Sequence, residues 1–305
     1  MSLAAYELVN VTKIYPGQDE PANRDVCMEI LPGEIFGFLG DNGAGKTTLV
    51  RQMVNLLKST SGRILLFGKD LNSDSLRVPL HVGYMPQDYY SLNNMSVGEA
   101  LYFTARLRGL SHSGAVREQK RMLESWEIGS LRDRINTRLS GGQRRLLRLA
   151  VAMVGSPPVL ILDEPTNDLD PQRRNLVWDQ LRRENVERGA TILLITHDAI
   201  EAEKVIQRVG IMKQGRLVAV GSPAALKRSI DQKLRLEIFF APQSPPRLPA
   251  GLVYQVVQPG RWLVYLERQQ AAAVLEQLDL SQVDDFRLFS ATLEDLYLHY
   301  ASPRP

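Results

Sequence analysis

The sequence contains a single cysteine, Cys27, among 305 residues. A disulfide within one chain is therefore excluded, and the composition fits a reducing compartment. The four histidines are scattered along the chain and show no zinc-type spacing; they are His81, His112, His197 and His299. We therefore expect neither a disulfide framework nor a zinc site built from cysteine and histidine.

Long hydrophobic runs are also missing. No apolar stretch approaches the roughly 18 residues that a membrane-spanning helix needs. The densest apolar stretches, residues 159–162 and 192–195, have the length of buried strands. Residues 1–7 lack a basic segment followed by an apolar one, so no signal peptide is expected. We expect a chain that neither spans nor crosses a membrane.

A large excess of charge of one sign is absent as well. The chain has 37 Lys and Arg and 34 Asp and Glu, a formal net charge of +3. Such a small excess does not identify a nucleic-acid-binding protein. Arginines gather at residues 144–148 and 173–183, and we interpret them as solvated helix faces or as ligand and partner contacts. No nucleic-acid partner is expected.

The pattern of apolar residues predicts two regions. Residues 1 to about 230 alternate strand and helix patterns, as in one α/β domain. Strands are expected at 6–11 (an edge strand), 35–39, 159–162 and 191–196, a hairpin at 209–220, and helices at 46–57, 97–107, 143–154 and 171–188.

The second region covers residues 231–305, where the pattern of apolar residues changes. Its short strand and helix patterns predict a small α+β domain. Strands are expected at 234–240, 252–257, 262–266 and 286–289, and helices at 269–278 and 293–300. Residues 241–250 contain four prolines and are expected to form an irregular loop.

The strongest chemical signal is a glycine-rich segment at residues 40–47, with the sequence GDNGAGKT. It fits the pattern G-x-x-x-x-G-K-[ST], follows an expected strand and precedes an expected helix. Glycines let successive backbone N–H groups turn toward phosphates, and the helix N-terminus adds positive potential. The segment predicts ATP or GTP binding by Asn42, Gly43, Ala44, Gly45, Lys46, Thr47 and Thr48, with Lys46 on the outer phosphates and Thr47 on Mg²⁺.

Two acidic residues, Asp163 and Glu164, follow the apolar strand pattern at residues 159–162. A buried strand can direct Asp163 toward Mg²⁺, and Glu164 can polarise the attacking water as a general base. A solvated strand end is the alternative. The phosphate loop earlier in the chain favours the catalytic interpretation.

Residues 139–143 read Leu-Ser-Gly-Gly-Gln. This is the signature sequence of the ATP-binding cassette (ABC) transporter ATP-binding subunits, and it precedes the two acids in the order that this family shows. The chain therefore resembles that family. Ser140, Gly141, Gly142 and Gln143 are implied to contact ATP, although Ser140 could instead be an ordinary helix cap.

The resemblance implies roles for four further residues. Gln87 stands where the family has a glutamine that touches Mg²⁺ and the attacking water. His197 stands where the family has a histidine that contacts the γ-phosphate. Asp170 matches the loop that crosses the dimer interface. Tyr15 stands where an aromatic ring stacks on adenine, although a tyrosine after a strand can also pack in the core.

The resemblance also implies the architecture. The family fold is a P-loop α/β core with a helical subdomain, here at about residues 88–155, and an antiparallel β-subdomain. Its cofactors are ATP and Mg²⁺. Residues 291–298, ATLEDLYL, resemble the closing helix of bacterial ABC exporter ATPases that move drugs, lipids or polysaccharides outward.

In this family the signature of one subunit closes over ATP bound to another. The resemblance thus implies a homodimer, or a heterodimer with a similar cassette, bound to integral membrane transporter subunits on the cytoplasmic face of the cell membrane. Tyr89, Tyr90 and Leu92 are candidate contacts to that membrane partner, or else core residues.

The alternative is a soluble ABC-type ATPase that acts on ribosomes or nucleic acid. Ribosome-acting relatives usually carry two cassettes joined by a charged linker, whereas this sequence has one phosphate loop. DNA-repair relatives insert long coiled coils into the cassette. Here Lys46 and Ser140 are 94 positions apart (140 minus 46), which leaves no room for such an insertion. The sequence does not reveal a cargo.

Overall fold

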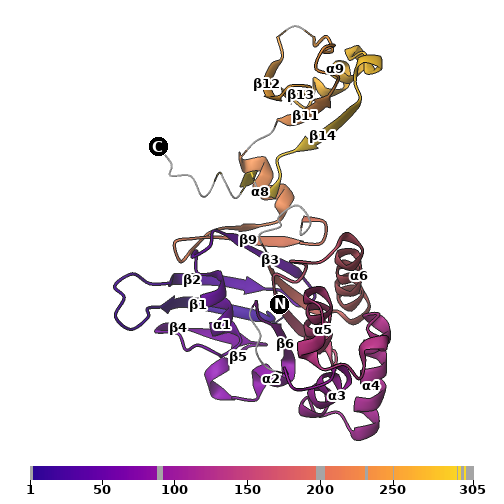
Figure 1. Cartoon of the computed structure of the whole chain (residues 1–305). Helices are drawn as coiled ribbons and strands as arrows, with labels where there is room; N and C mark the ends of the chain where they lie inside the picture. Colours follow the sequence, from indigo (N-terminus) through magenta and orange to yellow (C-terminus); the bar gives the residue numbers. More distant parts are fainter. Residues whose placement is uncertain are drawn as a thin grey trace. The chain divides into compact units, whose positions relative to one another are not determined.

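The computed structural model describes residues 3–87, 92–196, 203–230, 233–249, 251–293, 295, 296 and 299. The chain divides into two compact units, Met1–Gly221 and Ser222–Pro305 (Figure 1). The sequence placed a boundary at about residue 230. The structure instead assigns helix α8 (Pro223–Ile230) to the second unit.

The first unit contains an antiparallel sheet with the strand order β2-β1-β4-β5. Its strands are β1 (Tyr6–Lys13), β2 (Asn23–Ile30), β4 (Ser61–Leu66) and β5 (Lys69–Asp70). Strand β1 pairs with β2 on one side and with β4 on the other. The prediction of an edge strand at residues 6–11 is therefore wrong, because alternation reveals the buried face of a strand but not its neighbours.

The second sheet of this unit has the order β10-β9-β3-β8-β7-β6. Its strands are β3 (Ile35–Gly40), β6 (Val82–Met85), β7 (Val159–Asp163), β8 (Thr191–Ile195), β9 (Arg208–Lys213) and β10 (Arg216–Gly221). All neighbours are parallel except the hairpin β9–β10. Because the strands from β3 to β6 are parallel, the segments that follow them emerge at one edge of the sheet.

Helix α1 (Lys46–Met53) packs in the core of the first unit. Leu49, Val50 and Met53 are fully buried and share one apolar cluster with Leu8 of β1 and Phe38 of β3. The helix ends at Met53, whereas the sequence predicted residue 57. Asn55 has φ 57°, a left-handed conformation that ends a helix and that asparagine tolerates.

The remaining helices of this unit are α2 (Arg77–His81), α3 (Val97–Leu107), α4 (His112–Ser125), α5 (Gly141–Met153) and α6 (Pro171–Arg188), with 3₁₀ turns at Leu71–Ser73, Gly129–Leu131 and Asn136–Arg138. Helix α6 has the bounds that the sequence predicted and connects the parallel neighbours β7 and β8. The expected βαβ unit is confirmed. Among the described residues, no helix is both long and apolar enough to cross a bilayer.

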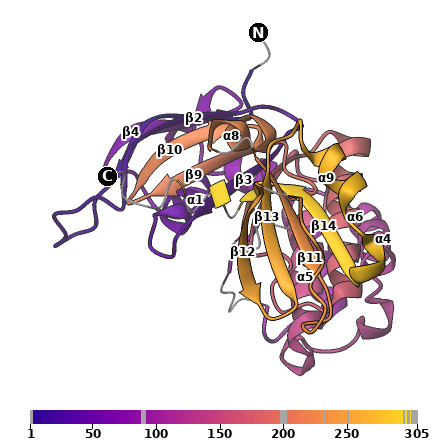
Figure 2. The same ribbon diagram turned by 90° about the horizontal axis from the view of Figure 1, so that it is seen from above.

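The second unit is a small α+β structure, as the sequence predicted. Besides α8 it contains β11 (Leu234–Phe239), β12 (Val253–Gln258), β13 (Arg261–Leu266), α9 (Ala271–Gln277), the 3₁₀ turn Leu280–Gln282 and β14 (Asp285–Ser290). The strands are antiparallel in the order β12-β13-β11-β14 (Figure 2). Ala271 and Val274 of α9 pack in one cluster with Leu236, Ile238 and Val264 of the sheet.

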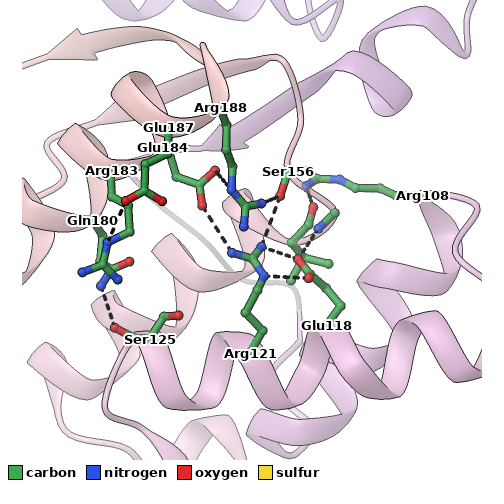
Figure 3. A network of polar contacts seen from close by, with 12 residues as sticks. Arg108, Glu118, Arg121, Ser125, Ser156, Gln180, Arg183, Glu184, Glu187 and Arg188 are labelled. Atoms are coloured by element: carbon green, nitrogen blue, oxygen red, sulfur yellow. Dashed lines mark hydrogen bonds and ion pairs between the residues drawn. The ribbon is translucent and has the colours of Figure 1, made fainter.

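A network of charged side chains joins α4 to α6 (Figure 3). Arg121 of α4 contacts Glu118 of the same helix at 2.6 Å and Glu184 of α6 at 3.3 Å. Arg188 of α6 contacts Glu184 at 3.5 Å and donates a hydrogen bond to Ser156, which lies between α5 and β7. Glu184 is buried, and a buried carboxylate is tolerated only when it is paired in this way.

The same network fixes the end of α5. Glu118 accepts a 2.7 Å hydrogen bond from the Gly155 amide. Arg108 donates to the carbonyl oxygens of Ala152, at 3.0 Å, and Val154. Burial lowers the pKa of Arg108 to about 10, which leaves it charged at neutral pH. The connection between α5 and β7 is therefore held by charged groups of two other segments.

Acid is predicted to weaken this network. Burial disfavours the Glu118 carboxylate, but hydrogen bonds from Arg121 and Gly155 and the charges of Arg121 and Arg188 hold its pKa below its ordinary value. A carboxyl group with a lowered pKa stabilises the fold above its unfolded-state pKa, and this contribution is lost as the pH falls through its folded-state pKa.

We expect Glu118→Gln to lower the free energy of unfolding at pH 7 by about 2 kcal/mol, because it removes the negative charge with which the partly buried Arg121 guanidinium is paired. The difference from the parent chain should narrow as the pH falls below about 4. Urea unfolding of the variant and the parent chain between pH 7 and about pH 4 and below measures the loss of stability and its pH dependence. Glu124→Gln, which removes an exposed 3.8 Å pair with Lys120 on the same helix, is the matched control. Equal losses in the two variants would contradict the prediction.

Candidate nucleotide-binding site

One pocket of about 550 Å³ lies where the segments after β3, β6 and β7 come together. Nine residues that the sequence predicted for nucleotide or metal binding line it. They are Asn42, Gly43, Gly45, Lys46, Thr47, Thr48, Gln87, Asp163 and Glu164. The parallel order of the sheet thus brings together residues that are up to 122 positions apart (164 minus 42).

The glycine-rich loop connects β3 to α1. Gly43 and Gly45 have φ values of 84° and 98°, in the left-handed region that glycine enters at little cost. Gly45 is the N-cap of α1 and offers no side chain to the helix, so the first N–H groups are left to an external acceptor. Backbone N–H groups at a helix start form an anion-binding site.

Lys46 is the first residue of α1. Its Nζ donates to the carbonyl oxygens of Gly40 at 2.7 Å and Asp41 at 2.9 Å. Burial lowers the pKa of the Lys46 ammonium, and the carboxylates of Glu164, Asp163 and Asp41 oppose this effect. The ammonium therefore lies between the loop and the two acids that end β7.

Asp163 is 2% exposed at the end of β7. Burial, and in second place the charge of Asp163, raises the pKa of Tyr84 to about 12. The next residue, Glu164, has φ 53°, a strained conformation for a residue other than glycine. Its amide donates to Ile195 at 2.8 Å, and its carbonyl oxygen accepts from Arg145 at 2.6 Å, so both sides of this residue are fixed.

Arg145 was not identified as a site residue from the sequence. It lies on α5, two residues after Gln143, and also contacts Asp168 at 3.6 Å. Its side chain is 11% exposed, and burial lowers the pKa of its guanidinium. The sequence showed it only as one of a group of arginines, because its contacts are made to a distant part of the chain.

Four residues that line the pocket were not predicted: Ala22, Asp41, Asn167 and Ile195. Ala22 precedes β2, and Ile195 ends β8. Asn167 follows Glu164, and its amide donates to the Glu164 carbonyl oxygen at 3.3 Å. Asp41 lies in the glycine-rich segment, and Asn167 lies in the loop that also carries Asp170. Ala22 and Ile195 belong to no short motif, so only their position in the fold reveals them.

The donor groups of the pocket fit a magnesium ion. Thr47, Gln87 and Asp163 supply one hydroxyl, one amide and one carboxylate. The described residues contain no group of three His, Cys, Asp or Glu side chains that could hold a metal without help. Such a sparse set of oxygen donors suits Mg²⁺, which takes most of its ligands from phosphates and water in nucleotide sites.

The signature residues lie outside this pocket. Ser140 caps α5: its hydroxyl accepts from the Gln143 amide at 3.3 Å, and the Gln143 side chain accepts from the Ser140 amide at 3.0 Å. The helix-cap interpretation is thus correct as a description of one chain. Ser140 and Gly141 are exposed, and Gly142 and Gln143 are half-buried.

The other predicted residues lie apart from the pocket lining. Asp170 caps α6 and accepts from the Arg173 amide at 2.9 Å. The Tyr15 hydroxyl is 3.3 Å from Oγ1 of the lining residue Thr48, and Ala44 is a buried residue of the loop itself. The predictions for His197, Tyr89 and Tyr90 fall on residues outside the described part of the chain.

Comparison with known proteins identifies the family. Residues 23–167 match the family described as ABC transporter. The human phospholipid-transporting ATPase ABCA3 is 35% identical over 260 residues, which cover 84% of this chain and 15% of ABCA3. ABC transporter A family member 5 of Arabidopsis thaliana is 30% identical over 315 residues, 96% of this chain and 33% of that protein. The chain thus spans a third or less of the length of these relatives.

Solved structures agree with this match. The ATP-binding subunit of an ABC transporter superposes with a TM-score of 0.69 at 25% identity, covering 74% of this chain and 92% of that one. The dimeric cassette MJ0796, bound to ADP and Pi, shares the fold with a TM-score of 0.67 at 24% identity, over 71% of this chain and 98% of that one.

The phosphate loop, the two acids at the end of β7 and the helix-capping signature thus lie on the fold of a known group of nucleotide-binding subunits. The chain belongs to the ABC transporter family and contains an ATP-binding cassette.

Proposed function

We propose that this cassette is the ATP-hydrolysing motor of an exporter whose membrane-spanning part is a separate protein. The observation that carries the proposal is the division of its motifs. The phosphate loop, Gln87, Asp163 and Glu164 share one pocket, whereas Ser140 and Gly141 are exposed outside it. One chain therefore contains the groups for hydrolysis in one pocket. The N-terminus of α5, which could bind a phosphate, lies outside that pocket.

ATP hydrolysis follows from the groups in the pocket. The loop amides and Lys46 would bind the β- and γ-phosphates, and Thr47, Asp163 and Gln87 would hold Mg²⁺. A bound magnesium ion would supply positive charge against the phosphate oxygens. Glu164 accepts the proton of the attacking water. The fixed, left-handed backbone at Glu164 supports this role, because strained residues cluster where a side chain must be held in place.

A second cassette completes the site. Ser140 and Gly141 begin helix α5, so the helix presents a hydroxyl and backbone N–H groups to its exterior. We propose that they bind the γ-phosphate of ATP held by a second copy or by a similar cassette. Asp170 is then at the interface, and Tyr15 and His197 contact adenine and the γ-phosphate, respectively. Since ATP binds best to the closed dimer, its hydrolysis allows the dimer to open.

The membrane partner is proposed to dock beside Gln87. Helix α3 follows this segment and exposes Phe103 and Leu107, the latter to 84%. Large exposed apolar side chains on a helix are typical of partner contacts. With Leu92 they would form a docking surface on the cytoplasmic face of the membrane.

The cargo is proposed to be a lipid or another amphipathic molecule, moved outward. Two relatives support this: human ABCA3 and ABCA7 are both phospholipid-transporting ATPases, and ABCA7 is 36% identical over 221 residues, 72% of this chain and 10% of that protein. The match to the Arabidopsis A family member extends over both units of the chain. The resemblance of residues 291–298 to exporter ATPases points in the same direction.

We expect Glu164→Gln to lower the rate of phosphate release by at least about 100-fold, because the water loses its proton acceptor. Since ATP binding remains, size-exclusion chromatography with Mg²⁺ and ATP should show a persistent dimer. Glu187→Gln, which changes an exposed glutamate on α6, is the matched control and should behave like the parent chain. Turnover at the parent rate in Glu164→Gln would remove Glu164 from the role of base.

We expect Gln87→Ala to uncouple hydrolysis from the membrane partner more than it weakens ATP binding. The side chain lines the pocket and is exposed, after the short strand β6, so it would be accessible to both Mg²⁺ and the proposed partner. Transport by membrane vesicles that contain the chain and its partner should fall about 10-fold or more, while the Kd for ATP changes less than about 3-fold. Unchanged transport would contradict the proposed docking beside Gln87.

A further inference from the structure

Two buried amide side chains, Asn23 and Gln52, lie directly behind the phosphate loop. Asn23 begins β2 and is 0% exposed, and Gln52 lies in the last turn of α1 and is 2% exposed. Asn23 Nδ2 donates to the Gly45 carbonyl oxygen at 3.0 Å. Gln52 Nε2 donates to Asn23 Oδ1 at 2.8 Å and to the Thr48 carbonyl oxygen at 3.2 Å.

These bonds set the direction of loop N–H groups. A trans peptide is planar, so its C=O and the following N–H point in opposite directions. The Gly45 carbonyl oxygen accepts from Asn23 Nδ2 and also from the Leu49 amide at 2.9 Å, which occupies both of its lone pairs. The Lys46 N–H of the same peptide must then point away from Asn23, toward the opening of the pocket.

The neighbouring peptide is held in the same manner. The Ala44 carbonyl oxygen accepts from the Gly215 amide of the β9–β10 turn at 3.0 Å, which directs the Gly45 N–H away from that turn. The packing is close: a Cβ on Gly45 would lie 2.2 Å from the Ala22 carbonyl oxygen and 2.6 Å from Asn23 Nδ2. The loop is therefore pressed against β2 and has no room to rotate its peptides in that direction.

This arrangement is poor for stability alone. Gln52 Oε1 is buried and has no hydrogen-bond partner in the described part of the chain. A buried polar atom without a partner is costly, whereas two apolar side chains of similar shape can fill the same space at little or no cost. Packing stability therefore does not explain why amide side chains occupy these two positions, and a functional role does.

We propose that Asn23 and Gln52 are positioning residues for ATP binding: they hold the Gly45 carbonyl so that the loop N–H groups face the phosphates before the nucleotide arrives. Neither residue lines the pocket, so they act through the loop backbone. Losing them costs affinity for nucleotide, because the loop must then be ordered on binding. Proton transfer at Glu164 does not involve them.

The proposal rests only on ATP binding at this pocket. It does not depend on dimerisation or on a membrane partner. If the parent chain binds no MgADP, the assignment of the pocket fails; if it binds MgADP and the variants bind equally well, only the role of Asn23 and Gln52 fails.

The test compares nucleotide affinity with stability in three variants: Asn23→Leu, Gln52→Met, and the double variant Asn23→Leu/Gln52→Met. Calorimetric titration with MgADP gives Kd, and thermal unfolding without nucleotide gives Tm. Each single variant should bind about 3- to 10-fold more weakly, the effect of losing one buried hydrogen bond. The double variant should recover the Tm of the parent chain but not its Kd.

Asn185→Leu is the matched control. Asn185 donates to the carbonyl oxygens of Gly33 at 2.7 Å and Ala190 at 2.8 Å, before β3 and β8 and so at the opposite ends of these strands from the loop. It should lower Tm and leave Kd unchanged. Steady-state turnover adds a second readout: KM should rise in the Asn23 and Gln52 variants while kcat stays within about twofold.

Recovery of both Tm and Kd in the double variant would overturn the proposal, since the pair would then serve packing alone. An unchanged Kd in a folded Asn23→Leu variant, or an equal loss of affinity in Asn185→Leu, would also overturn it. If Asn23→Leu does not fold, Gln52→Met still tests the proposal. This variant keeps Asn23 but removes the hydrogen bond from Gln52 that holds its side chain, so an unchanged Kd would refute the role of the pair.

Discussion

A phosphate loop can bind its ligand only when its N–H groups face outward, and planarity then forces the carbonyl groups of the same peptides to face into the protein. Those carbonyls need partners, because a buried acceptor without a hydrogen bond is costly. Here the partners come from far away in the sequence: Asn23 at the start of β2 and Gly215 in the β9–β10 turn. The loop is thus fixed at the place where elements of both sheets of the first unit meet.

The second constraint is the parallel order of the six-stranded sheet. Strands β3, β8, β7 and β6 are neighbours, so everything that follows them emerges at one edge. That edge gathers a cation, Lys46, two carboxylates, Asp163 and Glu164, and an amide, Gln87, around a single pocket. The close approach of opposite charges is visible in the pKa of Lys46, where burial and the nearby acids act in opposite directions.

Helix α5 links this pocket to the signature. It begins at the Ser140 cap, carries Arg145 to the backbone of Glu164, and ends in the segment that Arg108 and Glu118 hold. One helix therefore connects the exposed helix start, the strand end that carries Asp163 and Glu164, and the charged network (Figure 3). In the proposed dimer, where the signature would bind ATP held by a second cassette, α5 would connect the two nucleotide sites through one helix.

The sequence by itself determined the family, the phosphate loop, the acids after β7, the signature and helix α6, because each is a local pattern whose chemistry needs fixed spacing. It also indicated both α/β and α+β regions from periodicity. It could not show that β1 lies inside a sheet or that α1 stops at Met53. Nor could it show that Arg145, Asn23 and Gln52 donate hydrogen bonds to backbone carbonyls of the residues that line the pocket. Those facts depend on strand neighbours and on contacts between distant segments. Only the tertiary structure decides them, because a hydrogen bond across the core leaves no periodic trace in the sequence.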